Sequence, residues 1–341
     1  MRKFSTSLIL FSIAYWMVAA LYFIGIRYSY TPDFEGIDKN PDILVQSLIP
    51  GVILGLIFGF IESNRKSRMQ SFLMLILFRA LFYDLLFTVT VFVSSLYNNS
   101  LEFAINFLFQ GDAVVVIGHL FVASMFYHFL IQINRRFGPG ILFKYVTGAY
   151  FKPKEEERVF MFLDLKSSTT LAEKFGNIKY SQFIQNCFNL LTDPIQKSKG
   201  EIYQFVGDEV VLTWKLTADN VKNCLDFYFD FDKTLANNED FFVKEFGVRP
   251  YFKAGVSCGT VTVAEVGSLK TEIAYHGDVL NTAARIQGLC NEFDKQLLIS
   301  EFAANHLNNG YRPTLVTETQ LRGKEEKVSV FAVDNKTEIN I

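Results

Sequence analysis

The sequence has no excess of either charge: 33 Lys and Arg residues face 35 Asp and Glu residues, and the formal net charge is −2. This balance argues against a broadly basic surface for nucleic acids. Cysteine is scarce, and its four residues form no CxxC pair, so neither a disulfide framework nor a zinc site has support. Cys187, Cys224, Cys258 and Cys290 are therefore predicted to be buried apolar residues. Internal repeats and low-complexity tracts are also missing.

Long hydrophobic runs, in contrast, are concentrated at the front of the chain. Residues 4–26, 43–62, 71–97 and 112–133 are each about as long as the roughly 20 apolar residues that cross a hydrocarbon core. We predict four transmembrane helices, which form a domain over residues 1–133. The first run is longer than the apolar part of a secretory signal and has no evident cleavage site after it, so it is predicted to be a membrane span.

Basic residues flank these runs on one side of the predicted membrane. They precede the first run, fill the loop between the second and third, and follow the fourth: Arg2, Lys3, Arg65, Lys66, Arg68, Arg135 and Arg136. The other two loops, 27–42 and 98–111, carry few. Because Lys and Arg stay on the cytoplasmic side, both termini are predicted to be cytoplasmic. The protein is expected in the plasma membrane, the inner membrane of a bacterial cell, as a multi-pass protein.

Two ionisable residues, Arg79 and Asp84, interrupt the third run. Each would cost on the order of 2.5 to 3.5 kcal/mol at the centre of a bilayer, so they must be paired or hydrated. Two interpretations stay open, an interhelical ion pair and a signal-responsive site. In the fourth run, His119 and His128 are expected on opposite helix faces, which disfavours a haem or metal pair on that helix.

The rest of the chain is predicted to be a short transmission linker, residues 134–154, and a soluble domain, residues 155–341. Gly138, Pro139 and Gly140 would interrupt a helix that leaves the fourth run. Apolar patterning then predicts strands at 158–165, 201–205 and 209–214, two strands within 251–267, and strands near 296–300 and 328–333. Helices are expected at 177–198, with a shorter one before it, and at 217–246 and 279–293. The order of these elements is that of an α+β ferredoxin-like sheet with additions.

Two carboxylates, Asp164 and Asp208, are predicted to meet at one edge of this sheet. Asp164 ends the first strand, and Asp208 follows Gly207 in a hairpin turn. Each alone has an ordinary interpretation as a strand-end or turn residue. Together they are costly unless a cation shares them, and Mg²⁺ takes one or two carboxylates together with phosphate oxygens and water. Glu209 begins the next strand and is not predicted to be a ligand.

Two further segments could contact a phosphorylated substrate. The segment after Asp164, "LKSSTT", opens a helix whose backbone N–H groups could hold a phosphate. Its candidate binding residues are Leu165, Ser167, Ser168 and Thr169. Asn281 and Arg285 are four residues apart, so they project from one helix face and could orient a sugar oxygen and neutralise a phosphoryl transition state. Alone, that spacing is also typical of an ordinary solvated helix face.

Four motifs occur together: "VFMFLDLKSST", "FVGDEVV", "GDVLNTAARIQ" and "LRGKEEKVSVFAV". Their order and spacing, over about residues 155–335, resemble the catalytic domains of class III nucleotide cyclases. The resemblance implies that Asp164 and Asp208 hold two Mg²⁺ or Mn²⁺ ions. It also implies that Asn281 and Arg285 position the ribose and stabilise the transition state. The metal pair and the Asn/Arg pair would come from different subunits of a homodimer.

Three positions depart from the pattern that is common in this family. Arg322 stands where a triphosphate-binding lysine is usual, which keeps the charge and changes the geometry. Gln204 stands where adenylate-selective members commonly have Lys, and its amide can still pair with an adenine edge. Ala274 stands where Asp or Thr is common, and its side chain cannot form hydrogen bonds. Neither position has the residues associated with guanylate selectivity, so ATP is the expected substrate.

The sequence therefore predicts a membrane-anchored adenylate cyclase. It would convert ATP to 3′,5′-cyclic AMP and pyrophosphate by attack of the 3′-hydroxyl on the α-phosphorus, assisted by two metal ions. Three alternatives remain: a catalytically silent, cyclase-like signalling scaffold, a cyclase for GTP or a pyrimidine nucleotide, and a diguanylate cyclase. The last rests on "VGDEV", which resembles part of the diguanylate cyclase signature but lacks its second glycine and its aromatic residue.

Overall fold

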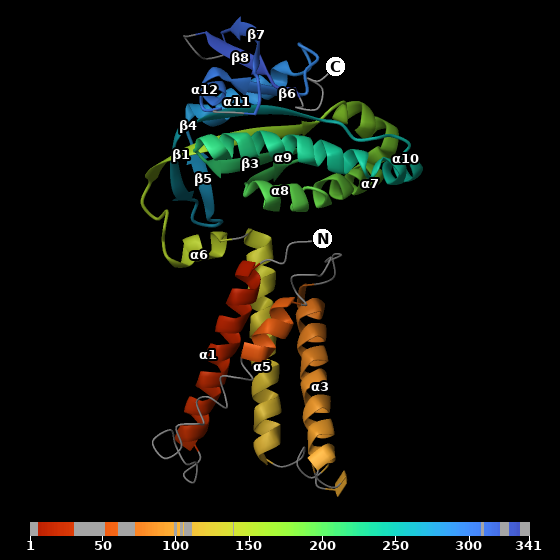
Figure 1. The fold of residues 1–341 in the computed structure, drawn as a ribbon, viewed down its shortest axis with the longest axis vertical. Helices are drawn as coiled ribbons and strands as arrows, with labels where there is room; N and C mark the ends of the chain where they lie inside the picture. Colours follow the sequence, from red (N-terminus) through yellow and green to blue (C-terminus); the bar gives the residue numbers. More distant parts are fainter. Residues whose placement is uncertain are drawn as a thin grey trace. The chain divides into compact units, whose positions relative to one another are not determined.

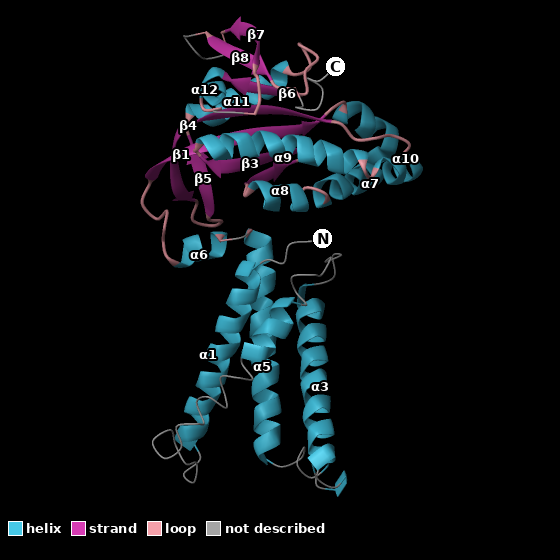
Figure 2. Cartoon of the chain, in the orientation of Figure 1, coloured by secondary structure: helices cyan, strands magenta, loops and turns pink. Residues whose placement is uncertain are grey.

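The computed structural model describes residues 6–30, 52–60, 72–98, 101–102, 105, 111–138, 140–307, 310–320 and 327–334. The chain divides into two compact units, Met1–Phe137 and Gly138–Ile341. The first unit is helical and the second is built around a sheet (Figure 1, Figure 2).

The first unit contains three long helices: α1 (Thr6–Tyr30), α3 (Phe72–Asn98) and α5 (Gly111–Phe137). Residues 52–60, within the predicted second run, are also helical. Among the described residues, one helical stretch, Val114–Phe137, is long and apolar enough to cross a membrane, and Leu8–Phe23 is a shorter apolar stretch. Helices thus lie where all four runs were predicted, and the prediction of four membrane spans remains a prediction.

Aromatic side chains from the four helical segments form the core of the first unit. Trp16, Phe58, Tyr83 and Tyr127 belong to one buried cluster, in which the Phe58 and Tyr83 ring centres are 4.0 Å apart. The Tyr127 hydroxyl lies 2.5 Å from Ser12 Oγ, which joins α5 to α1. The pairing of these segments therefore depends on large rings and a buried hydroxyl contact.

A small cavity of about 10 Å³ lies in this cluster and is lined by Trp16, Asp84 and Ser124, among others. Within the described part of the chain, Trp16 Nε1, Ser124 Oγ and Asp84 Oδ1 are buried without a hydrogen-bond partner. The cavity is close to the size that one water molecule needs. Asp84 thus lies at a polar point inside an aromatic core, and Arg79 on the same helix is 3% exposed.

The second unit is built on one eight-stranded sheet. Its strands are β1 (Lys154–Leu165), β2 (Glu201–Val206), β3 (Glu209–Lys215), β4 (Phe252–Val266), β5 (Glu272–His276), β6 (Leu297–Ser300), β7 (Thr314–Thr319) and β8 (Val328–Ala332). The strand order is β2-β3-β1-β4-β6-β8-β7, and β5 pairs with β4. The β4–β6 pair is parallel and the other pairs are antiparallel. The order of the first four strands confirms the predicted ferredoxin-like arrangement.

Helices cover the two faces of this sheet unequally. The helices of the second unit are α6 (Ile141–Val146), α7 (Ser168–Asn189), α8 (Thr192–Ser198), α9 (Ala218–Ala236), α10 (Glu239–Phe246), α11 (Asp278–Leu289) and α12 (Glu301–Asn305). Alternate β1 residues such as Met161 and Leu163 pack with Phe183 of α7 and Phe231 of α9, and we call this side the first face. Figure 1 shows α8 and α9 in front of β1 and β3.

The intervening residues of the strands point to the second face. Phe160, Val211 and Tyr275 form a smaller cluster there with Ala283 of α11 and Tyr150. Side chains alternate between the faces along a strand, so Asp164, two residues after Phe162 and four after Phe160, lies on this second face. The predicted metal carboxylate is therefore on the side of the sheet that α11 partly covers.

The predicted linker, residues 134–154, is divided between other elements. Helix α5 continues to Phe137, and β1 already begins at Lys154. Between them, Lys144 of α6 lies 3.1 Å from Glu201, the Tyr150 hydroxyl donates to Glu156 at 2.7 Å, and the Glu265 N–H donates to the Tyr150 carbonyl at 2.9 Å. Residues 144–150 are thus bonded to residues of β1, β2 and β4.

Some predicted element boundaries were wrong. The single helix expected at 217–246 is two helices, which are separated at Asn237 and Asn238, both weak helix formers. The two strands expected within 251–267 are one, because β4 pairs along the whole of β1 and passes through Gly259 at a φ of 152°. The helix expected at 177–198 ends at Asn189 and is followed by α8. Strands β5 and β7 were not predicted.

Candidate active site

Asp164 is the middle member of a row of charged side chains on the second face. Its cross-strand partners are Glu209 on β3 and Lys253 on β4. Lys253 Nζ lies 3.3 Å from Asp164 Oδ2, and the two side chains are 12% and 20% exposed. The register of three strands, rather than proximity in sequence, brings this row together.

Helix α11 adds an uncharged amide beside this row. Gln287 Nε2 donates a hydrogen bond to Asp164 Oδ2 at 3.0 Å. Burial raises the pKa of the Asp164 carboxyl above its ordinary value, the Lys253 charge opposes this rise, and the negative charge of Asp208 adds to it. The ionised form of Asp164 is therefore disfavoured and would gain from a cation.

Asp208 lies in the turn between β2 and β3, as predicted. Gly207 adopts a φ of 62°, which glycine accommodates without strain, and β3 begins at Glu209. Burial, together with the charges of Asp164 and Asp208, raises the pKa of Glu209 to about 7. Three carboxylates thus share one corner of the sheet and repel one another.

These carboxylates fit a hard divalent cation. Across the described residues, no cluster of three or more His, Cys, Asp and Glu side chains is arranged to hold a metal alone. Mg²⁺ does not require one, because it is commonly held by one or two carboxylates, with substrate phosphates and water as the other ligands. A cation bound at this corner would reduce the mutual repulsion of Asp164, Asp208 and Glu209.

Tyr180 is a further residue of this corner that the sequence did not reveal. Burial and the nearby charge of Asp208 raise the pKa of its phenol to about 12. The phenol therefore stays protonated at neutral pH and can donate a hydrogen bond. It comes from α7, which begins directly after the Asp164 strand.

The segment after Asp164 forms the start of α7. Leu165 is buried, and Ser167 adopts a left-handed conformation with a φ of 60° and a ψ of 31°. The Leu171 N–H is the donor to the Ser167 carbonyl, so the N–H groups before it, including those of Ser168 and Thr169, have no acceptor inside the helix. Such N–H groups at a helix start suit an anion such as phosphate.

Asn281 and Arg285 lie on α11, the helix that also carries Gln287. Asn281 is exposed, whereas Arg285 is half-buried and its Nη1 atom is buried with no hydrogen-bond partner in the described part of the chain. Between described residues, no hydrogen bond or ion pair joins Arg285 to Asp164 or Asp208. Among the described residues, one chain therefore brings the carboxylates together but gives Arg285 Nη1 no hydrogen-bond partner.

The two positions predicted to recognise the base lie on β2 and β5. A register shift between Ile202 and Gln204 pairs Gln204 with Val211, which points to the second face. Gln204 is exposed, and Ala274 is half-buried and pairs with Ala264. Because of this β-bulge, the Gln204 side chain points to the same face of the sheet as Asp164. Arg322 lies outside the described residues.

A match to a known family covers just over half of the chain. Residues 151–335 match the adenylate and guanylate cyclase catalytic domain. The chain belongs to the class III nucleotide cyclases.

Individual relatives of this cyclase domain share part of their length with the chain. Adenylate cyclase 2 of Rhizobium meliloti (strain 1021) is 33% identical over 213 residues, which are 60% of this chain and 57% of that protein. The adenylate cyclase of Anabaena cylindrica is 24% identical over 182 residues, 51% of this chain and 36% of that protein. The chain thus spans little more than half of the first relative and about a third of the second.

Solved structures show the same cyclase fold. A bacterial light-regulated adenylyl cyclase has a TM-score of 0.55 at 18% identity, with 67% of each chain covered. The adenylyl cyclase CyaB from P. aeruginosa has a TM-score of 0.50 at 16% identity, with 54% of this chain and 96% of that chain covered. At these identities the likeness concerns the fold alone.

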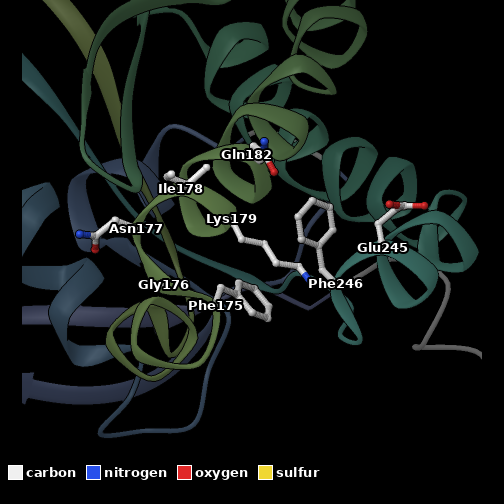
Figure 3. A pocket seen from close by; sticks show the side chains of 8 residues that line it. All are labelled: Phe175, Gly176, Asn177, Ile178, Lys179, Gln182, Glu245 and Phe246. Carbon is white, nitrogen blue, oxygen red and sulfur yellow. The ribbon is translucent and has the colours of Figure 1, made fainter.

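The cyclase domain also has a surface hollow that is separate from the predicted site. It has a volume of about 690 Å³ and lies between α7 and α10. Figure 3 shows the Lys179 side chain extending toward Phe246, whose ring centre is 5.9 Å from Lys179 Nζ. None of the residues predicted to bind substrate or metal lines this hollow.

Proposed function

We propose that this protein is a membrane-anchored adenylate cyclase that converts ATP to 3′,5′-cyclic AMP and pyrophosphate. The observation that carries this proposal is the corner where Asp164, Asp208 and Glu209 meet beside the start of α7. It combines a cluster of carboxylates for cations with free N–H groups for phosphate. An acidic corner alone would repel a triphosphate, so the substrate and the cations must bind together.

Asp164 and Asp208 would hold two Mg²⁺ or Mn²⁺ ions in each site. When bound, such ions lower the pKa of the substrate 3′-hydroxyl and neutralise charge on the triphosphate. The backbone N–H groups around Ser167, Ser168 and Thr169 hold phosphate oxygens, and Leu165 anchors this segment in the core. Lys253 and Gln287 keep Asp164 in place through its Oδ2 atom.

Asn281 and Arg285 would complete the site from a second subunit of a homodimer. Asn281 hydrogen-bonds the ribose and holds the 3′-hydroxyl in line with the α-phosphorus. Arg285 donates to the oxygens of the α-phosphoryl group, where negative charge develops as the P–O bond to pyrophosphate breaks. The Nη1 atom of Arg285 supports this arrangement, because it has no acceptor among the described residues of its own chain. Arg322 binds the outgoing phosphates.

ATP is the proposed nucleotide. Gln204 faces the same side of the sheet as Asp164, and its amide can donate to and accept from the edge of an adenine. Ala274 contributes shape rather than hydrogen bonds. Two similar proteins, from Rhizobium meliloti and Anabaena cylindrica, are named adenylate cyclases, which agrees with this choice.

The first unit is proposed to anchor the enzyme with four spans, residues 1–133, and both termini in the cytoplasm. Apolar helices at the positions of all four runs support this, and the basic loop residues give the orientation. Residues 134–154 would transmit conformational changes of these helices to the catalytic domain, residues 155–341. The bundle would hold two subunits together.

A direct assay tests the proposed activity. Membranes that contain the protein are incubated with Mn²⁺ or Mg²⁺ and, separately, with ATP, GTP, CTP and UTP. We expect cyclic AMP from ATP, and none from an Asp208→Asn variant that is present at the same level. Formation of cyclic GMP alone would overturn the choice of base, and the lack of any cyclic nucleotide from the folded protein would overturn the activity.

A further inference from the structure

Asp164 shares one oxygen between two donors from different parts of the chain. Gln287 Nε2 lies 3.0 Å from Asp164 Oδ2, and Lys253 Nζ lies 3.3 Å from the same atom. Between described residues, no donor is hydrogen-bonded to the other oxygen, Oδ1. The two contacts therefore orient the carboxylate and leave Oδ1 for a further partner.

The Gln287 side chain is held firmly by its surroundings. It is 7% exposed, and its neighbour Ile286 is fully buried in a cluster with residues of β6 and β8. The backbone of α11 packs directly against β4 at Gly255. A Cβ atom added to Gly255 would lie 2.2 Å from Gln287 N and 2.4 Å from the Ala283 carbonyl oxygen. Because Gly255 permits this close contact, the amide has a fixed position over Asp164.

An amide suits this position better than a carboxylate. Asp164, Asp208 and Glu209 already repel one another, and a fourth negative charge at residue 287 would increase the repulsion. Gln287 instead donates an N–H to Asp164 without adding charge. It favours the ionised carboxylate, which is the form that binds a cation.

We propose that Gln287 is a positioning residue for the divalent cation, which acts by fixing Asp164 of its own chain. This rests on the proposed function, in which Asn281 and Arg285 of the same helix act in the site of the other subunit. Helix α11 then serves two sites at once. Its last turn orients the cation ligand of its own chain, and its first turns supply the ribose and phosphate contacts to the partner.

Metal binding gives a readout that does not depend on turnover. The full-length protein in detergent is titrated with Mn²⁺ in the presence of 3′-deoxy-ATP, which cannot cyclise, and free Mn²⁺ is followed by electron paramagnetic resonance. Gln287→Met keeps the length and apolar volume of the side chain but removes the donor. We expect Mn²⁺ affinity to fall about 10-fold, as is typical when the outer partner of a metal ligand is removed.

Two variants serve as controls. Gln185→Met makes the same change at an exposed position of α7 and should leave the affinity unchanged. Gln287→Glu, which adds a carboxylate, should weaken Mn²⁺ binding at least as much as Gln287→Met. Thermal unfolding without Mn²⁺ shows whether each variant is folded. Unchanged affinity in folded Gln287→Met would overturn the inference, whereas a wild-type protein without Mn²⁺ binding or cyclase activity would overturn the proposed function itself.

Mixed dimers show which site Gln287 acts on. A dimer of an Asp208→Ala chain with an Asn281→Ala chain has one intact site, whose carboxylates come from the Asn281→Ala chain. Gln287→Met on that chain should raise the Mn²⁺ concentration for half-maximal activity about 10-fold. On the Asp208→Ala chain it should leave this concentration unchanged. An equal shift from both placements would indicate a general disturbance of α11 and would contradict the positioning role.

Discussion

At the scale of single residues, the site brings together charged side chains that are costly to bury. Asp164, Glu209 and Lys253 form a row across three strands, and Gln287 joins it from a position 123 residues away in sequence. The sequence predicted Asp164 and Asp208 from their places at a strand end and in a turn. Lys253 and Gln287 could not be predicted in this way, because their roles depend on strand register and helix docking.

Arg285 gives a prediction that separates catalysis from stability. Its Nη1 atom has no hydrogen-bond partner in the described part of the chain, so Arg285→Ala should leave the thermal unfolding temperature nearly unchanged. The value of kcat should fall about 1,000-fold, at the lower end for a transition-state arginine. Arg285→Lys should restore little, because an ammonium lacks the planar fork of donors. A large loss of stability with normal kcat in Arg285→Ala would contradict the assignment.

The four buried cysteines allow a prediction about how their thiols react with a labelling reagent at different pH values. Burial raises the pKa of Cys258 and of Cys290 to about 12, and also raises the pKa of Cys187 and Cys224. The reactive species is the thiolate, and at pH 8 a thiol with a pKa near 12 is ionised in only about one molecule in 10,000. We expect a thiol reagent to label none of the four in the native protein between pH 7 and 9, and all four in denaturant. Rapid native labelling at pH 8 would contradict their burial.

At the scale of elements, the sequence predicted the ferredoxin-like arrangement of the first four strands and the helix that carries Asn281, because apolar patterning is strong there. It did not predict the bulge before Gln204, since only the register of β2 against β3 reveals it. The break at Asn237 and the continuity of β4 were missed for a related reason. Local propensity is weak at both places, and pairing or packing with distant segments determines the outcome.

The segment before β1 is bonded to the sheet, and this contact can be tested. The Tyr150 hydroxyl donates to Glu156, whose other oxygen accepts from Nε of the buried Arg158 at 2.8 Å. Tyr150→Phe removes one hydrogen bond, which should cost about 1 kcal/mol of local stability. The Glu265 N–H, which donates to the Tyr150 carbonyl, should then exchange with deuterium about five-fold faster. Unchanged exchange would show that this contact does not hold the segment in place.

At the scale of the whole molecule, the chain has two units with separate cores. The first unit has an aromatic core of its own, and the second has one core on each face of its sheet. Asp84 lies in the aromatic core of the first unit, and its Oδ1 atom is buried without a hydrogen-bond partner in the described part of the chain.

Deletion of residues 1–137 tests whether the first unit holds the subunits together. Subunits that a membrane holds together meet at a high effective concentration, which free domains lack. The truncated protein, Gly138–Ile341, should therefore have low activity per chain when dilute and gain activity as its concentration rises. Activity per chain that equals that of the full-length protein at every concentration would show that the first unit contributes nothing to dimer formation.

The central claim is that two chains share each active site, and mixed dimers test it most directly. Asp208→Ala and Asn281→Ala chains, each expected to be inactive alone, are produced together in equal amounts. Random pairing makes half of the dimers mixed, each with one intact site of two, so about a quarter of the wild-type cyclic AMP formation should return. If both variants are folded and form mixed dimers but no activity returns, the shared site is contradicted.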